Sequence, residues 1–105
     1  LAVGAAHFWQ GLGYVRVFEW NGSVWIQKGE DLIGEQTTEH FGTSVSLSAK
    51  GNRVAVGTND YAISIWFQGV VRVFGWKEEE VEWKQIGENV IGLDAYQGWG
   101  ECVRL

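Results

Sequence analysis

One stretch of this chain occurs twice, and this repetition constrains the fold more than any other feature. Residues 13–20 read Gly-Tyr-Val-Arg-Val-Phe-Glu-Trp, and residues 69–76, at an offset of 56, match them at six of eight positions. Residues 25–30 (Trp-Ile-Gln-Lys-Gly-Glu) return at an offset of 58 as residues 83–88 (Trp-Lys-Gln-Ile-Gly-Glu). Self-similarity at such a period marks repeat architectures, because a single unit cannot bury its apolar face alone. We therefore expect two copies of one structural unit.

The apolar residues of the repeated segment alternate with the period of a β-strand. Within residues 14–20, Val15 and Val17 point to one side, whereas the aromatic side chains point to the other. Both sides carry apolar groups, so we expect a strand that is covered on both faces. The offset of 56 gives Val71 and Val73 the same positions in the second copy, and all four valines are predicted to be buried. No segment has the length and periodicity of a helix.

Turn signals separate four short strands in each unit. Asn21-Gly22 lies between aromatic strand ends, and the polar turn Ala49–Asn52 lies between two apolar runs. Both patterns are typical of antiparallel hairpins. We name the predicted strands A to D, and in the complete copy they cover Thr43–Ser48, Arg53–Thr58, Gly69–Trp76 and Glu82–Ile86. Matching segments elsewhere give the strand order B-C-D-A-B-C-D-A.

Four short antiparallel strands per unit are the anatomy of a β-propeller blade. The predicted fold class is therefore all-β with about two blades, and a flat meander sheet or a small barrel is the alternative. On this prediction residues 1–40 end one blade, residues 41–98 form a full blade, and residues 99–105 begin the next. Only the six-residue equivalent of Ser48–Arg53 separates Leu105 from a following Leu1. We interpret the chain as a segment whose partners are the remaining blades or further copies of itself.

The composition opposes several classes of partner. The net charge of −5 disfavours nucleic acid, which requires a basic surface that neutralises phosphates, and also disfavours anionic membranes. The chain has no apolar run long enough to cross a bilayer, so we expect no membrane insertion. Its single cysteine, Cys102, permits no internal disulfide and is interpreted as a small buried strand residue.

Short motifs recur at fixed places in the unit. Strand A opens with Phe41-Gly42, strand B ends in Gly57-Thr58-Asn59, and strand C has a Gly-x-Val-x-Val-aromatic pattern at residues 13–18 and 69–74. These residues resemble the FG-GAP repeats of integrin-α-like β-propellers, in which strand B ends in Gly-Ala-Pro. With its Trp-x-Gln-x-Gly segments, the chain looks like a Trp-rich branch of such repeats. The resemblance covers nearly the whole chain, implies a propeller, and favours an extracellular or cell-surface location.

Many FG-GAP repeats have an acidic A–B turn that ligates calcium, and this chain departs from that pattern. Its turn, Ala49–Asn52, contains a lysine and one amide but no carboxylate. Hard cations require several oxygen ligands. We therefore expect no metal and no other cofactor, and we expect calcium to leave the melting temperature unchanged.

Ligand contacts are expected on the long loops at one end of the blades. The B–C and D–A connections meet at this end, and loops held by a rigid scaffold often carry function. They comprise Ala5–Leu12, Thr58–Gln68, Glu35–His40 and Asp94–Gly98. The candidate contacts are His7, Trp9, Asp60, Tyr61 and Trp66, and Glu39, His40, Asp94 and Tyr96 lie at the same end. The repeated tryptophans Trp20, Trp25, Trp76 and Trp83 are instead assigned to packing between blades.

These observations predict a non-catalytic scaffold for binding or adhesion, with a protein or a glycan as its ligand. A lectin-like propeller is the first alternative, and it requires Trp9 and Trp66 to be exposed on one face. The second alternative is an enzyme whose catalytic residues lie in other blades. The chain itself contains no nucleophile elbow, His-Glu-x-x-His motif or phosphate-binding glycine loop. His7 and His40 have no metal-ligand spacing, so no catalytic residue is assigned.

Overall fold

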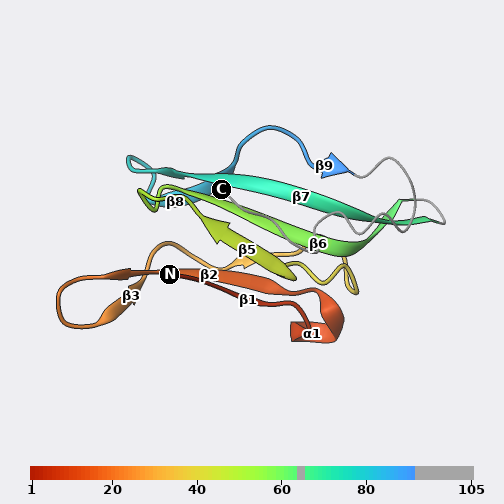
Figure 1. Cartoon of the computed structure of the whole chain (residues 1–105), viewed down its shortest axis with the longest axis horizontal. Helices are drawn as coiled ribbons and strands as arrows, with labels where there is room; N and C mark the ends of the chain where they lie inside the picture. The colour runs from red at the N-terminus through yellow and green to blue at the C-terminus, as the bar shows by residue number, and fades with distance from the viewer. Residues whose placement is uncertain (64–65, 92–105) are drawn as a thin grey trace.

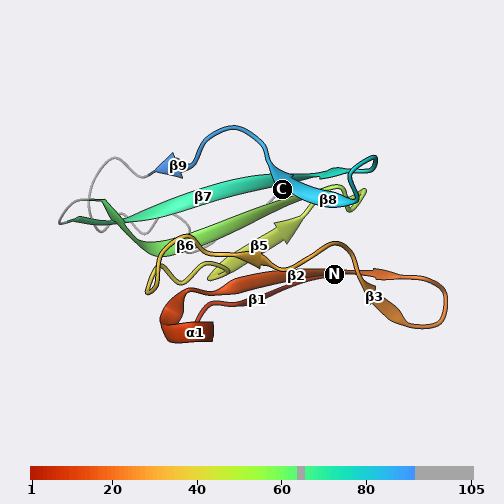
Figure 2. The same cartoon turned by 180° about the vertical axis from the view of Figure 1, so that it is seen from behind.

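The fold consists of two antiparallel β-sheets that lie one above the other (Figures 1 and 2). The computed structural model describes residues 1–63 and 66–91. The first sheet contains β1 (Ala2–Ala5), β2 (Tyr14–Trp20), β3 (Trp25–Gln27) and β4 (Leu32–Ile33). The second contains β5 (Ser44–Leu47), β6 (Arg53–Ile63), β7 (Trp66–Lys77), β8 (Glu82–Gln85) and β9 (Val90–Ile91). We call these sheets the first unit and the second unit.

The two units have the same strand pairing. β2 pairs with β1, β3 and β4, as β7 pairs with β6, β8 and β9. The pairing registers of the two sheets are also equivalent when residues are matched at the repeat offsets of 56 and 58. Trp20 pairs with Trp25 as Trp76 pairs with Trp83, and Tyr14 pairs with Ile33 as Val70 pairs with Ile91. All predicted strands from the first B to the second D are present, and each D strand is followed by a further two-residue strand, β4 or β9, that was not predicted. The final A strand, residues 99–105, lies outside the described residues.

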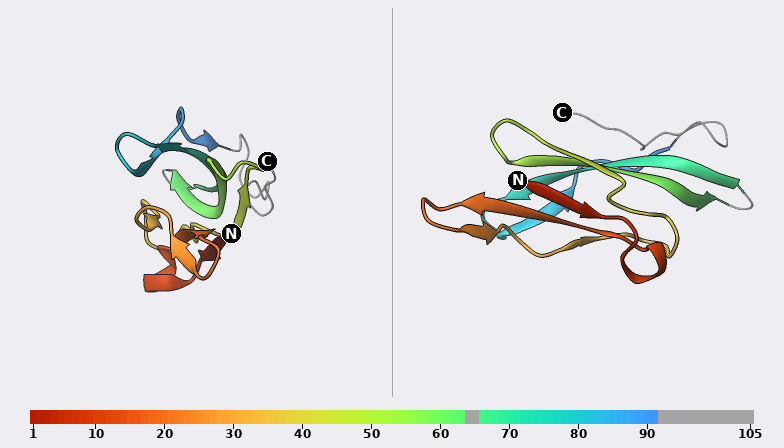
Figure 3. Two further views of the ribbon diagram at one scale, coloured as in Figure 1. Left: turned by 90° about the vertical axis from the view of Figure 1, so that its left-hand side faces the viewer. Right: turned by 60° about the horizontal axis from the view of Figure 1, so that its bottom comes forward.

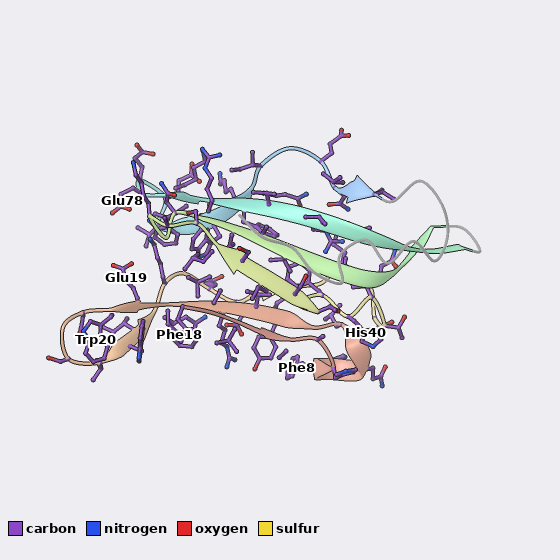
Figure 4. The ribbon with its side chains drawn as sticks, in the orientation of Figure 1. Phe8, Phe18, Glu19, Trp20, His40 and Glu78 are labelled. Atoms are coloured by element: carbon purple, nitrogen blue, oxygen red, sulfur yellow. The ribbon has the colours of Figure 1, made fainter. Side chains whose placement is uncertain are left out.

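Each sheet has two chemically different faces. Adjacent residues of a strand point to opposite sides, so Val15 and Val17 lie on one side of β2, whereas Phe18 and Trp20 lie on the other. The equivalent residues on β7 are Val71 and Val73 on one side, and Phe74 and Trp76 on the other. We call these sides the valine face and the aromatic face of each unit. Figure 4 shows Phe18 below β2 and Glu19 above it, on the side of the second sheet.

The units pack by unlike faces. The valine face of the first unit, with Val15 and Val17 buried, forms one core cluster with Val54 and Val56 of β6. Val54 pairs directly with Phe74 across the strands, so this side of β6 belongs to the aromatic face of the second unit. Phe74 and Trp76 pack against the same cluster. The end-on view in Figure 3 shows the two layers that this contact holds together.

The unlike packing explains one partly wrong prediction. Val15 and Val17 are buried as expected, but Val71 and Val73 are only half-buried. Among the described side chains of β7, Val70 and Arg72 are the fully buried ones. They lie on the aromatic face, which contacts the first unit, whereas the valine face of the second unit points away from it.

Two further predictions are wrong. Both concern the end of the sheets that lies opposite the turn at residues 21–24. A short helix, α1 (Phe8–Gly11), joins β1 to β2, although no helix was predicted. Its residues Trp9 and Gln10 have positive φ angles of 51° and 57°, so it is an irregular turn. The expected loop Thr58–Gln68 is wrong, because β6 continues to Ile63 and β7 begins at Trp66. Among the described residues, no helix is long and apolar enough to cross a membrane.

Gly13 allows the chain between the units to pass close to β2. Its φ is 79°, and a Cβ atom at this position would overlap the carbonyl oxygen of Phe41, which is fully buried. Gly51 provides a matched comparison, because its φ is 72° but a Cβ atom there would meet nothing within 4 Å.

Replacement of these two glycines by alanine should therefore have different costs. Gly51→Ala should reduce the free energy of unfolding by about 1–2 kcal/mol, the cost of a left-handed backbone. Gly13→Ala adds a clash with backbone, so its cost should exceed about 3 kcal/mol. Urea denaturation of both variants measures the difference. Equal losses would show that Phe41 does not pack against Gly13 as described.

Candidate functional site

At the predicted ligand end, the structure brings one candidate residue, His7, into contact with His40. The rings of His7 and His40 meet edge to face, with their centroids 5.0 Å apart. Trp9, on α1, is 68% exposed. Figure 4 shows Phe8 and His40 at this end of the molecule. His7 and His40 are separated by 33 positions and have no repeat counterparts, so sequence spacing gave no signal for their contact.

The other three candidate contacts lie on strands. Asp60 and Tyr61 belong to β6, and Trp66 belongs to β7. Tyr61 pairs with Gln68 and Ile63 pairs with Trp66, so these residues extend the hairpin beyond the part that the repeat predicted. The side chains of residues 59–68 lie outside the described part of the structure, as do Asp94 and Tyr96. Their placement next to His7 and Trp9 remains a prediction.

Glu39 was predicted only to lie at the ligand end, and it is a buried structural residue. One carboxylate oxygen, Oε2, accepts hydrogen bonds from the backbone N–H groups of Glu35 (2.8 Å) and Gln36 (2.7 Å). The other, Oε1, accepts a hydrogen bond of 2.7 Å from Nη1 of Arg72. Nη2 of Arg72 donates to Oε1 of Glu35 at 2.6 Å. Glu39 and Arg72 are both fully buried, so neither is available to a ligand in this arrangement.

This ion pair fixes the segment that connects the two units. Removal of two charges from water is costly, and close pairing with additional hydrogen bonds offsets the cost. The hydroxyl of Thr58 donates to the backbone carbonyl of Glu39, and the guanidinium of Arg72 lies 5.3 Å from the ring centroid of Phe41. The connection is therefore held by β6 and β7 of the second unit.

The opposite end of the molecule carries a junction between the units made of aromatic rings and a turn. Trp76 and Trp83 pair across β7 and β8 with their ring centroids 5.3 Å apart. The turn at Lys28-Gly29 of the first unit covers them. Nε1 of Trp83 donates to the carbonyl of Lys28 at 2.8 Å, and Nζ of Lys28 lies 5.1 Å from the centroid of Trp76. Trp83 is only 8% exposed as a result.

The equivalent pair of the first unit is uncovered. Trp20 and Trp25 have centroids 5.4 Å apart, yet they are 53% and 54% exposed. They border a hollow of about 380 Å³ that Lys28 and the A–B turn also line, and a second hollow of about 260 Å³ lies beside Gly29 and Trp76. No predicted ligand residue lines either hollow. The packing role assigned from the repeat holds for Trp76 and Trp83, whereas Trp20 and Trp25 lack such a partner within the described residues.

A matching polar cluster occurs on the aromatic face of each unit. Nε of Arg16 donates to Asp31 at 2.8 Å and Gln27 donates to the same oxygen at 2.6 Å. Arg72 and Gln85 make the same bonds to Asn89, at 3.0 Å and 2.8 Å. The hydrogen bond from Arg16, followed by that from Gln27, lowers the pKa of Asp31 below its ordinary value. Each cluster ties the central strand of the sheet to the chain before β4 or β9.

The comparisons with known proteins add no identity. No protein-family model matches this chain, and no curated protein matches it significantly. Within residues 1–63 and 66–91, no group of three or more histidine, cysteine, aspartate or glutamate side chains is arranged to hold a metal ion. The candidate sites are thus the exposed tryptophan pair at one end, and the exposed Trp9 and the pair of His7 and His40 at the other.

Glu39→Gln should be strongly destabilising. The amide nitrogen would face either Arg72 or the two backbone N–H groups, and it would leave donors buried without an acceptor. We expect a loss of about 3 kcal/mol or more in the free energy of unfolding. Glu35→Gln is the matched control, because the Glu35 side chain is half exposed and its loss should cost less than about 1 kcal/mol. Similar costs in denaturant titrations would contradict a structural role for Glu39.

Asp31→Asn should remove a small pH dependence of stability. Because the folded pKa of Asp31 is lowered, its ionised form stabilises the fold above the unfolded pKa of about 3.9, and this contribution disappears as pH falls through the folded value. The pair is partly exposed, so the effect should stay below about 1 kcal/mol. Urea titrations between about pH 6 and pH 3 should show the two proteins converging at acid pH. A constant difference would refute the assignment.

Proposed function

We propose that this chain is a non-catalytic segment of a β-propeller-type scaffold, in which successive four-stranded units pack around an axis and display a binding surface. The FG-GAP-like motifs support the propeller, and the equal pairing registers support the repeat. A binding or adhesion role is what the resemblance implies, and the exposed Trp9 on the connection between β1 and β2 supports it.

One observation carries this proposal: the units contact each other by unlike faces. The valine face of the first unit packs on the aromatic face of the second. A contact of this kind is heterologous, so the same operation can be repeated to add another unit at either end. In the part of the chain that the structure describes, no sheet covers the aromatic face of the first unit, and the valine face of the second unit points away from the first. Propellers use about four to eight such units, so two units are part of a ring.

A glycan ligand at the loop end is a second candidate, which the exposure of Trp9 favours. An exposed aromatic ring can stack on the apolar face of a sugar, and Trp9 is 68% exposed. Glycan-array binding that is lost in Trp9→Ala would support this candidate. Binding that persists in the variant would place the sugar elsewhere.

The proposed scaffold predicts that units stabilise one another across copies. The test protein is a tandem of two copies of the chain, linked by the sequence of the chain's own A–B hairpin, residues 48–53 (Ser-Ala-Lys-Gly-Asn-Arg). The tandem should melt at a higher temperature than one copy, and the melting temperature of one copy should rise with its concentration. Calorimetry and sedimentation velocity test both points. A monodisperse monomer near 11.8 kDa whose tandem melts at the same temperature would overturn the proposal.

A further inference from the structure

The Trp20–Trp25 and Trp76–Trp83 pairs have the same geometry but different surroundings. Each pair joins directly opposite residues of neighbouring strands, and the ring geometries agree: 5.4 Å and 59° for Trp20 and Trp25, against 5.3 Å and 64° for Trp76 and Trp83. Only the second pair is covered. Because the pairs occupy equivalent positions, the covered pair shows what kind of group fits the exposed one.

The cover of the second pair is a turn of specific shape. Gly29 adopts a φ of 79°, and a Cβ atom on it would lie 2.9 Å from atoms of both rings, so only glycine permits this approach. The adjacent Lys28 carbonyl accepts the indole hydrogen bond of Trp83. The ammonium group of Lys28 adds a cation–π contact with Trp76 and Trp83. Backbone shape and the indole hydrogen bond therefore define the contact, and the lysine adds to it.

The same turn exists in the second unit. The N–H of Lys28 donates to the carbonyl of Val17 at 2.7 Å, and the N–H of Ile86 donates to the carbonyl of Val73 at 2.7 Å. Gly87, with a φ of 71°, takes the place of Gly29. Here a Cβ atom would meet nothing within 4 Å, and Ile86 is 41% exposed. Within the described residues, the chain thus presents an uncovered tryptophan pair on one unit and, on the other, a turn whose glycine contacts no neighbouring unit.

We propose that the Trp20–Trp25 pair binds the Ile86-Gly87 turn of a second copy of this chain. The proposal rests on the scaffold function proposed above and names the contact that continues it. The indole N–H of Trp25 donates to the carbonyl of Ile86, as Trp83 donates to Lys28. The aliphatic side chain of Ile86 packs on the rings of Trp20 and Trp25, in the place that Lys28 takes at the junction within the chain. This contact between copies is therefore apolar and depends only weakly on salt.

The central test compares two substitutions at neighbouring exposed positions. Trp25→Ala removes the docking surface and should weaken self-association by about tenfold or more, as truncation of a central interface tryptophan does. Val24→Ala is the control. Val24 is 55% exposed, but its counterpart Glu82 stays exposed beside the covered pair, so the control should associate like the parent chain. Sedimentation velocity over a concentration series measures both, with circular dichroism to verify folding.

A mixing experiment distinguishes docking from a loss of folding. Ile86→Glu keeps the tryptophan pair but places a carboxylate against the ring faces, so it should also abolish association. An equimolar mixture of Trp25→Ala and Ile86→Glu retains one intact surface of each kind. It should form one-to-one dimers and nothing larger. Ile86→Lys, which copies the internal junction, should associate at least as tightly as the parent chain.

The outcomes separate this inference from the scaffold proposal. If the parent chain associates and Trp25→Ala associates equally well, copies add by another surface, and the docking inference fails while the scaffold proposal stands. If the parent chain stays monomeric at all concentrations and the tandem gains no stability, both fail. If the two variants do not complement each other on mixing, the contact is not between the tryptophan pair and the turn.

Discussion

The structure depends on the burial of the valine face of the first unit against the aromatic face of the second. One sheet alone would leave Val15 and Val17 in water, and full burial of each such side chain is worth about 1.5–3 kcal/mol. The neighbouring sheet provides Val54, Val56 and Phe74 for this purpose. Because the two faces differ, the contact has a direction, and it leaves a different face available at each end of the pair.

Polar groups fix the geometry of this apolar contact. The ion pair of Arg72 and Glu39 holds the connection between the units, and the close passage of Phe41 over Gly13 brings the connection against β2. At the other end, the Lys28 carbonyl accepts the indole hydrogen bond of Trp83. The two units are therefore clamped at both ends of their interface, and their faces are held in one register.

The two ends of the molecule differ in the groups that they expose, and this difference bears on function. The loops around α1 rest on a buried charge network and carry exposed groups such as Trp9, which suits a surface that meets a ligand. Trp20 and Trp25 form an aromatic pair with the same geometry as Trp76 and Trp83, but no turn covers it within the described residues. A scaffold whose units add in one direction requires this second kind of surface.

Residue order alone predicted much of this architecture. The repeat, its period-two pattern and its turn residues indicated the repeated antiparallel strands, because strand formation and hairpin turns depend on local sequence, but not the extension of β6 and β7 beyond the repeat. The same pattern could not tell that Val15 would be buried and Val71 only half-buried, since equivalent residues differ here only in which neighbour covers them. Nor could it identify Glu39 as a buried partner of Arg72, or bring His7 to His40, because these contacts join distant segments. The sequence by itself determined the unit, its strands and its two unlike faces; only the packing of one unit on the next decided which face, which charge and which tryptophan pair are covered, because burial is a property of neighbours in space.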